Sequence, residues 1–294
     1  MTYSIVARDR QTGELGVAVQ SHWFSVGSIV TWARPGVGAV ATQANARAAY
    51  GPEALDLLAS GISAVDALHR LTAADEGAAG RQVAVVSASG EVAAHTGASC
   101  MAFAGHVTGD QVSCQANIMA NPGVWPAMLE AFNTAAGPLA SRLVTALDAG
   151  EAAGGDIRGR QSAALLVVPA TGEPWETLVS LRVEDHPEPL SELRRVMGLH
   201  DAYAVAGEGD ELTNQGRHDA ASERYRRAAE LAPGNHELLF WSGLGTVSSG
   251  DIDAGVALVR EAIALHHGWA DLLPRLPPEV APEARVVCER LGLG

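Results

Sequence analysis

Apolar stretches of strand length recur in neighbouring pairs through the first two thirds of the chain, and a turn-forming dipeptide separates each pair. The pairs are "YSIVAR" with "ELGVAVQS", "GSIVTWAR" with "VGAVATQA", "RQVAVVS" with "EVAAHTG", and "RQSAALLVV" with "ETLVSLRVE". The dipeptides between them are Thr12-Gly13, Pro35-Gly36, Ser89-Gly90 and Thr171-Gly172. Such dipeptides favour tight turns, so the pattern predicts antiparallel hairpins, with "QVSCQANIM" as a further strand.

Stretches with helical periodicity also come in pairs. "GPEALDLLAS" is followed by "SAVDALHRLTAAD", in which Ser63 is placed as N-cap and Asp66 as the acid at the third helical position. A second pair is expected at roughly residues 122–133 and 138–149. Because strands follow strands and helices follow helices, the order predicts antiparallel sheets with helices outside them, an α+β class, rather than an alternating parallel sheet.

From about residue 190 the sequence reads as helical and repeats itself. "GRHDAASERYRRAAEL" and "GDIDAGVALVREAIAL" align with a period of 34 residues. The matched pairs are Gly216/Gly250, Asp219/Asp253, Ala220/Ala254, Ala228/Ala262 and Leu231/Leu265. This period resembles that of tetratricopeptide repeats. We therefore predict two domains, residues 1–188 and 189–294, joined near "EDHPEPL", where Pro187 and Pro189 interrupt regular structure. Two repeats are fewer than a free-standing array needs, which favours packing on the main domain or a homo-oligomer.

Composition limits the partners. Hydrophobic residues make up 47% of the chain and charged residues 18%, as in ordinary globular proteins. No basic and apolar leader opens the sequence and its apolar runs are too short to cross a bilayer, so we expect a cytoplasmic protein. The net charge of −14 is spread over both halves, which argues against nucleic acid and against membrane surfaces as partners.

Residue types that carry common cofactor chemistry are missing or scattered. All 20 basic residues are Arg, which excludes a phosphate-binding Gly-Lys loop, a Lys Schiff base and a Lys general base. The three cysteines, Cys100, Cys114 and Cys288, form no Cys-x-x-Cys pair, so neither a zinc site nor a disulfide framework is indicated. We predict no metal and no organic cofactor.

Thr2 is the strongest candidate for a catalytic residue. An initiator Met is normally removed before a small residue, which would leave Thr2 with a free α-amine beside its own hydroxyl. An unperturbed α-amine has a pKa of roughly 7.7–8.0, so near neutral pH part of it is unprotonated and can act as a base. One residue then supplies both nucleophile and base, as in N-terminal Thr hydrolases.

Several quoted segments resemble one protein family when taken together. They are "MTYSIVARD", "TGELGVAVQS", "GVGAVATQA", "RQVAVV", "GHVTGD", "CQANIM" and "GGDIRGRQSAALLVV". The family is that of domain of unknown function 1028 (DUF1028), and the resemblance covers residues 1 to about 190. It looks like a branch of the N-terminal-nucleophile (Ntn) hydrolases, which implies a four-layer αββα sandwich of antiparallel sheets. Several members also carry a helical, repeat-like tail.

The same resemblance implies roles for residues at matching positions. Thr2 matches the nucleophile, Asp156 is placed to hold or tune its amine, and Ser162 to relay a proton. Asn117 is placed as an oxyanion donor, because an amide within an apolar strand costs free energy unless it has a function. The residues expected to bind substrate are Gln20, His22, Gln43, Gln115, Arg158 and Gln161. Asp156 could equally cap its Gly-rich turn, and Ser162 and Gln161 could satisfy strand-edge backbone groups.

The chain departs from proteasome-like members of that superfamily, which place a Lys beside the nucleophile. Arg34 or Arg158 would have to supply the positive field, although an Arg does not exchange protons near neutral pH. The sequence therefore predicts hydrolysis of a linear or cyclic amide of a small molecule through an acyl-Thr2 intermediate. The alternative is a non-catalytic binding or scaffold protein whose helical tail is the interaction surface. A tail that binds cell-wall fragments is a third hypothesis.

Overall fold

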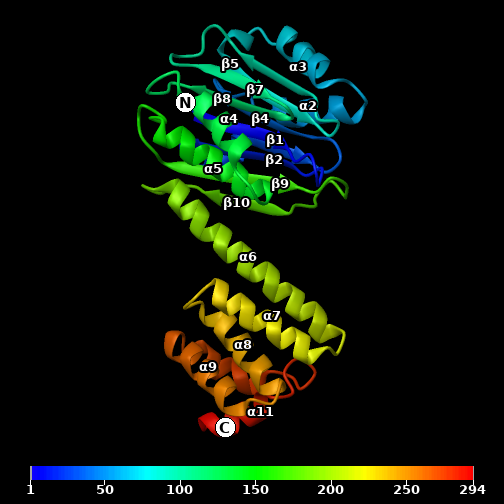
Figure 1. The fold of residues 1–294 in the computed structure, drawn as a ribbon, viewed down its shortest axis with the longest axis vertical. Helices are drawn as coiled ribbons and strands as arrows, with labels where there is room; N and C mark the ends of the chain where they lie inside the picture. Colours follow the sequence, from blue (N-terminus) through cyan, green and yellow to red (C-terminus); the bar gives the residue numbers. More distant parts are fainter. Residues whose placement is uncertain (1, 294) are drawn as a thin grey trace. The chain divides into compact units, whose positions relative to one another are not determined.

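The computed structural model describes residues 2–293 and separates into two compact units, with the boundary between Arg194 and Arg195 (Figure 1). We predicted a linker at 184–190 and a boundary after residue 188. The helix α6 (Pro189–Asn214) instead begins at Pro189 and runs through the boundary. Pro is compatible with this position because the first turn of a helix needs no N–H from it. No helix among residues 2–293 has the length and apolar character to cross a membrane.

The first unit holds two sheets in which every strand pairing is antiparallel. The larger sheet has the order β10-β9-β2-β1-β8-β7 and the smaller one β3-β4-β5-β6. The strands of the larger sheet are β1 (Thr2–Arg8), β2 (Leu15–Ser21), β7 (Gly105–Gly109), β8 (Val112–Asn117), β9 (Ser162–Val168) and β10 (Val179–Val183). Those of the smaller sheet are β3 (Thr31–Arg34), β4 (Gly38–Ala44), β5 (Arg81–Ser87) and β6 (Val92–Thr96). The predicted mixed class with antiparallel sheets is confirmed.

One predicted strand is partly wrong. The stretch "GSIVTWAR" begins with a short helix, α1 (Gly27–Val30), and only its second half forms β3. The reason is packing: a Cβ on Gly27 would lie 2.4 Å from the Cβ of Ala164 in β9, so the backbone turns directly against the larger sheet. Val26 and Val30 are thereby buried between the sheets.

The two sheets pack face to face, and helix pairs cover their outer faces (Figure 1). The core between the sheets includes Val6, Val17, Val19, Ala39, Ala41 and Ala84. The helices α2 (Tyr50–Ala59) and α3 (Ala64–Ala73) lie on the smaller sheet. The helices α4 (Val124–Thr134) and α5 (Leu139–Ala152) lie on the larger one. The predicted cap of α3 is present, because Ser63 Oγ accepts a hydrogen bond from Asp66 N at 3.0 Å.

The second unit consists of helices whose bounds follow the predicted period. The helices α7 (His218–Leu231) and α9 (Ile252–Leu265) begin and end 34 residues apart, as do the ends of α6 and of α8 (His236–Ser248). Gly216 lies between α6 and α7, and Gly250 lies between α8 and α9. Both have positive φ, at 71° and 101°. α10 (Gly268–Leu272), a 3-10 turn (Leu273–Arg275) and α11 (Ala284–Leu291) complete the unit. The 34-residue repeat read from the sequence is therefore also a repeat of structure.

Candidate active site at the start of the first strand

Thr2 is the first residue of β1, which lies between β2 and β8 in the larger sheet. It pairs with Asn117 of β8, and its Oγ1 donates to Ser21 Oγ of β2 at 3.1 Å. Because side chains alternate along a strand, Thr2 and Ser4 face the smaller sheet, whereas Tyr3 faces α5 and its hydroxyl donates to Glu151 at 2.7 Å. Thr2 is only 4% exposed, and strands on both sides hold it in place.

A network of buried amides fills the space between the sheets beside Thr2. Gln43 comes from β4 and Gln82 from β5, while Gln115 and Asn117 come from β8; all four side chains are buried. Gln43 Nε2 donates to Gln82 Oε1 at 2.8 Å, and Asn117 Nδ2 donates to the same oxygen at 2.9 Å. Gln115 Nε2 donates to Ser4 Oγ at 2.6 Å, and Ser4 Oγ donates to Gln43 Oε1 at 2.7 Å. The network thus links both sheets to the first strand.

The network holds the backbone of Thr2 directly. The carbonyl oxygen of Thr2 accepts from Gln43 Nε2 at 3.2 Å and from Asn117 Nδ2 at 3.4 Å. Both donor groups of Asn117 Nδ2 are therefore engaged by protein acceptors, which differs from the oxyanion role that we predicted for it. The geometry makes Asn117 a positioning residue for Thr2. Gln115 shares its face, as predicted.

Gln82 is the residue of this site that sequence reasoning missed. Its Nε2 donates to Thr96 Oγ1 at 2.9 Å and to the backbone oxygen of Ala116 at 2.9 Å, besides the two bonds that its Oε1 accepts. The signal was present, since Gln82 is a lone amide at the head of the apolar stretch "RQVAVV". A buried amide costs free energy unless it is bonded, and this holds for Gln82 as much as for Asn117.

Asp156 lies at the same end of the larger sheet but bonds to other groups than predicted. Its side chain is fully buried and accepts from His22 N at 3.2 Å and from Arg158 Nη2 at 2.8 Å. Arg158 N and Nε also donate to it, at 2.9 and 3.1 Å. The carboxylate thus fixes the loop after β2 and pairs with the charge of Arg158. His22 contributes its backbone to this arrangement.

Other predicted residues have local structural partners. Ser162 Oγ donates to the Trp23 carbonyl at 2.5 Å and accepts from Val26 N at 3.1 Å, so it supports the loop after β2 rather than a proton relay. Gln161 Nε2 donates to Asp185 at 3.1 Å. The contacts of Ser162 match the alternative in which it satisfies strand-edge backbone groups, whereas the side chain of Gln161 bonds to a carboxylate.

Two predictions of side-chain position are corrected by the strand register. Gln20 pairs with Tyr3 and therefore points to the opposite face of the sheet from Thr2. Its amide is fully buried and makes no hydrogen bond to another group of residues 2–293. Arg34 pairs with Gly38 of β4. Gly38 and Gln43 are five residues apart along this strand, which corresponds to roughly 17 Å. The Arg34 guanidinium bonds to Asp56 at 2.9 Å, so it does not supply a field at Thr2.

Loops from both sheets surround the Thr2 end and are tied to one another through their backbones. Asn45 N donates to the Gly80 oxygen at 3.1 Å, and Ser99 N donates to the Ala79 oxygen at 2.7 Å. At the end of β8, Ile118 has a φ of +55°, a conformation that costs a β-branched residue about 1–3 kcal/mol. Strain of this kind persists only where the surrounding structure enforces it. We call the loops 22–26, 44–49, 75–80, 97–104, 118–123 and 156–161 the rim.

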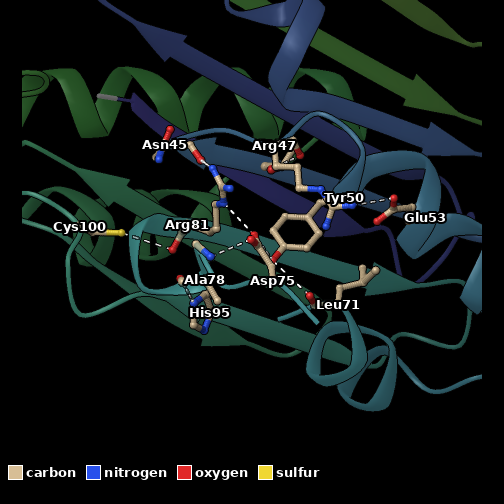
Figure 2. Close-up of polar contacts among 12 residues, drawn as sticks. Asn45, Arg47, Tyr50, Glu53, Leu71, Asp75, Ala78, Arg81, His95 and Cys100 are labelled. Carbon is tan, nitrogen blue, oxygen red and sulfur yellow. Dashed lines mark hydrogen bonds and ion pairs between the residues drawn. The ribbon is translucent and has the colours of Figure 1, made fainter. Parts of the chain in front are cut away.

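The rim beside β5 is fixed by an ionic cluster (Figure 2). Asp75 accepts from the Tyr50 hydroxyl at 2.9 Å and from Arg81 Nε at 2.9 Å. Arg81 also donates to the Asn45 oxygen, and its own carbonyl accepts from Cys100 Sγ at 3.3 Å. The hydrogen bond from Arg81 holds the pKa of Asp75 well below its usual range. Burial, and then Asp75, raise the pKa of Tyr50 to about 12.

The lowered pKa of Asp75 predicts acid sensitivity of the rim. Its contribution to stability is present above the unfolded pKa of 3.8 and is lost as the pH falls further, because the folded state resists protonation. We expect the melting temperature of the native protein to fall more steeply between about pH 5 and pH 2 than that of Asp75→Asn. Thermal unfolding across this range measures it, with exposed Asp271→Asn as control. Parallel curves for native protein and Asp75→Asn would contradict the assignment.

Among residues 2–293, no group of three or more His, Cys, Asp or Glu side chains is arranged to hold a metal ion. The three cysteines in this range are free, and burial raises the pKa of the Cys114 thiol far above its ordinary value. The groups that meet at the start of β1 are therefore hydroxyls, amides and one carboxylate–guanidinium pair. Such a set can position a hydroxyl nucleophile and hydrogen-bond a carbonyl compound.

Comparison with known proteins identifies the family. A protein-family model described as a family of unknown function (DUF1028) matches residues 2–193. The crystal structure of a protein from Silicibacter pomeroyi, described under the same family, is similar to this chain with 34% sequence identity and a TM-score of 0.62. That similarity covers 67% of this chain and 84% of the other. A search of the curated proteins found no match to this chain. Since the family match spans more than half of its length, this chain belongs to the DUF1028 family.

Proposed function

We propose that this protein is an N-terminal-nucleophile amidohydrolase that hydrolyses a linear or cyclic amide of a small molecule through an acyl-Thr2 intermediate. The observation that carries the proposal is the placement of Thr2. It is the first residue of a central strand, it pairs with Asn117 of β8, its hydroxyl bonds to Ser21 of β2, and two buried amides hold its carbonyl oxygen. The family match also begins at this residue. A residue held this firmly suits a nucleophile that must keep its position through two chemical steps.

The reaction needs the α-amine of Thr2 to be free, so whatever precedes Thr2 must be removed. The amine then takes the proton of Oγ1 as Oγ1 attacks the substrate carbonyl, and the tetrahedral oxyanion forms. Collapse breaks the C–N bond, and the amine of the protein gives the proton to the leaving nitrogen. Water, deprotonated by the same amine, then attacks the acyl-Thr2 ester. The bond between the acyl carbon and Oγ1 breaks, the amine returns the proton to Oγ1, and the acid is released. Ser21, whose Oγ accepts from Thr2 Oγ1 at 3.1 Å, orients the nucleophile.

Proton transfer falls to the α-amine because the chain has no Lys and because Arg158 is paired with Asp156. Turnover of small amides by the processed protein is therefore expected to rise with pH and to level off above about pH 8, following the free amine. Measuring acid release from a panel of linear and cyclic amides between about pH 5 and pH 9 tests this. A pH-independent rate, or an unchanged rate after acetylation of the α-amine, would contradict the proposal.

The helix-covered pair of sheets supports the Ntn part of this proposal, since the Ntn fold has the same order of layers. We extend the proposal to the second unit as a tetratricopeptide-like appendage, on the basis of its 34-residue repeat. We further propose a cytoplasmic homo-oligomer whose substrate is a small molecule rather than a nucleic acid, in keeping with the net charge of −14.

A second candidate function rests on a cavity within the second unit. Its volume is about 740 Å³, within the usual range for small-molecule sites, and its walls include Tyr203, Asp210, Tyr225 and Trp241. A binding protein that uses this cavity would need no nucleophile. Native protein that turns over no amide would favour this alternative.

A further inference from the structure

Exposed apolar side chains of the first unit gather on the rim. Among residues 2–194, eight large apolar residues are more than a third exposed: Trp23, Phe24, Val65, Met101, Phe103, Ile157, Trp175 and Leu178. Five of the eight lie on rim loops, with exposed fractions of 57% for Trp23, 62% for Phe24, 61% for Met101, 48% for Phe103 and 65% for Ile157. Scattered exposed apolar residues need no explanation, but a concentration at one end of a fold marks an interaction site.

Three of these residues are attached to the end of β8, beside the partner of Thr2. Asn117 pairs with Thr2, and Ile118 follows it. Ile118 N donates to the Met101 oxygen at 3.1 Å, and Ile157 N donates to the Ile118 oxygen at 3.3 Å. Met119 N donates to the Phe103 oxygen at 3.1 Å. The strained left-handed conformation of Ile118 thus occurs where the loops 97–104 and 156–161 bond to the end of β8, the strand that pairs with Thr2.

The other two residues are attached to β2, on the opposite side of Thr2. Trp23 follows Ser21 by two residues, and Ser21 Oγ accepts from Thr2 Oγ1. The Trp23 carbonyl accepts from Ser162 Oγ, which fixes the loop that carries Trp23 and Phe24. Since β1 lies between β2 and β8, the two groups of apolar side chains flank Thr2 from both neighbouring strands.

From this arrangement we infer that the five rim residues bind an apolar acyl group of the substrate, so that the enzyme acts on amides of acids with an alkyl or aryl chain. The inference rests on the proposed function and specifies its substrate class. Thr2 fixes where the carbonyl must lie, and the acyl chain attached to it extends into the apolar rim. Burying one methylene there is worth about 0.8 kcal/mol, or roughly a fourfold change in rate for each carbon.

The test is a series of β-lactones that differ only in the length of an unbranched alkyl substituent. Their acylation of the full-length processed protein is followed by intact mass. We expect the rate to rise about two- to fourfold per methylene over the first several carbons. Trp23→Ser and Ile157→Ser should flatten this dependence. Trp175→Ser is the matched control, since Trp175 is 76% exposed and lies in the turn between β9 and β10, away from Ser162.

The outcomes separate the inference from the function on which it rests. Acylation of Thr2 at a rate independent of chain length would overturn the acyl site and leave the proposed nucleophile standing. No acylation by any lactone would overturn both. A flat series together with a lower sedimentation coefficient for Trp23→Ser would also overturn the inference, because the rim would then be a contact between two copies of the chain.

Discussion

Thr2→Ala is expected to lower amide turnover by roughly 10³-fold or more and to abolish β-lactone labelling, because it removes the atom that attacks the carbonyl. Structurally the substitution is small. It removes one hydrogen bond, from Thr2 Oγ1 to Ser21 Oγ at 3.1 Å, which is worth about 1 kcal/mol. Acid release from amide substrates measures the first effect, and thermal unfolding measures the second.

The matched variant is Thr2→Ser, which keeps a hydroxyl at the same atom and the same free amine. It should retain labelling by β-lactones and a measurable fraction of turnover, while Thr2→Ala retains neither. If Thr2→Ala kept full turnover, the nucleophile would have to be another residue. If Thr2→Ala unfolded the protein, Thr2→Ser would still decide the question, because it preserves the contact with Ser21.

Gln82→Met is expected to destabilise the first unit by about 2–5 kcal/mol, the largest stability effect that we predict. Met has nearly the same length as Gln but neither its donor nor its acceptor. The substitution leaves Gln43 Nε2 and Asn117 Nδ2 without the oxygen that accepts from both, and it removes the bond from Gln82 Nε2 to the Ala116 carbonyl. Each buried polar group without a partner costs about 1–3 kcal/mol. Urea unfolding measures the loss.

The control for this prediction is Gln161→Met, an amide at the strand edge with one side-chain bond, to Asp185 at 3.1 Å. It should change the free energy of unfolding by less than about 1 kcal/mol. A Gln82→Met protein as stable as the native one would show that the amides between the sheets can rearrange. Thr2 would then not be rigidly held.

Much of the fold could be predicted because its signals are local. Tight-turn dipeptides marked the hairpins, and the Ser63 hydroxyl caps α3 as its spacing from Asp66 indicated. The repeat of 34 residues appeared as helices with the same offset. The stretch from Gly27 to Val30 was different, because its helical turn depends on the contact of Gly27 with Ala164, far along the chain.

The site was harder to predict because it depends on register and on the packing of one sheet against the other. Thr2, Asn117 and Gln43 could be named from sequence and resemblance, but not the bonds that Gln43 and Asn117 make to the Thr2 carbonyl. Gln20 was predicted to bind substrate, and the alternation of the strand puts it on the face of the sheet opposite to Thr2. Ser162 was assigned a chemical role by resemblance, whereas its bonds go to the loop after β2.

The most direct test of the account is an intact mass of the purified protein before and after exposure to a β-lactone that acylates N-terminal Thr, with the adduct mapped to a residue. The account predicts a chain that begins at Thr2 and gains one lactone on that residue. A chain that keeps Met1 on most molecules, or a processed chain that gains no adduct, would contradict it, because no Thr2 with a reactive amine and hydroxyl would then exist.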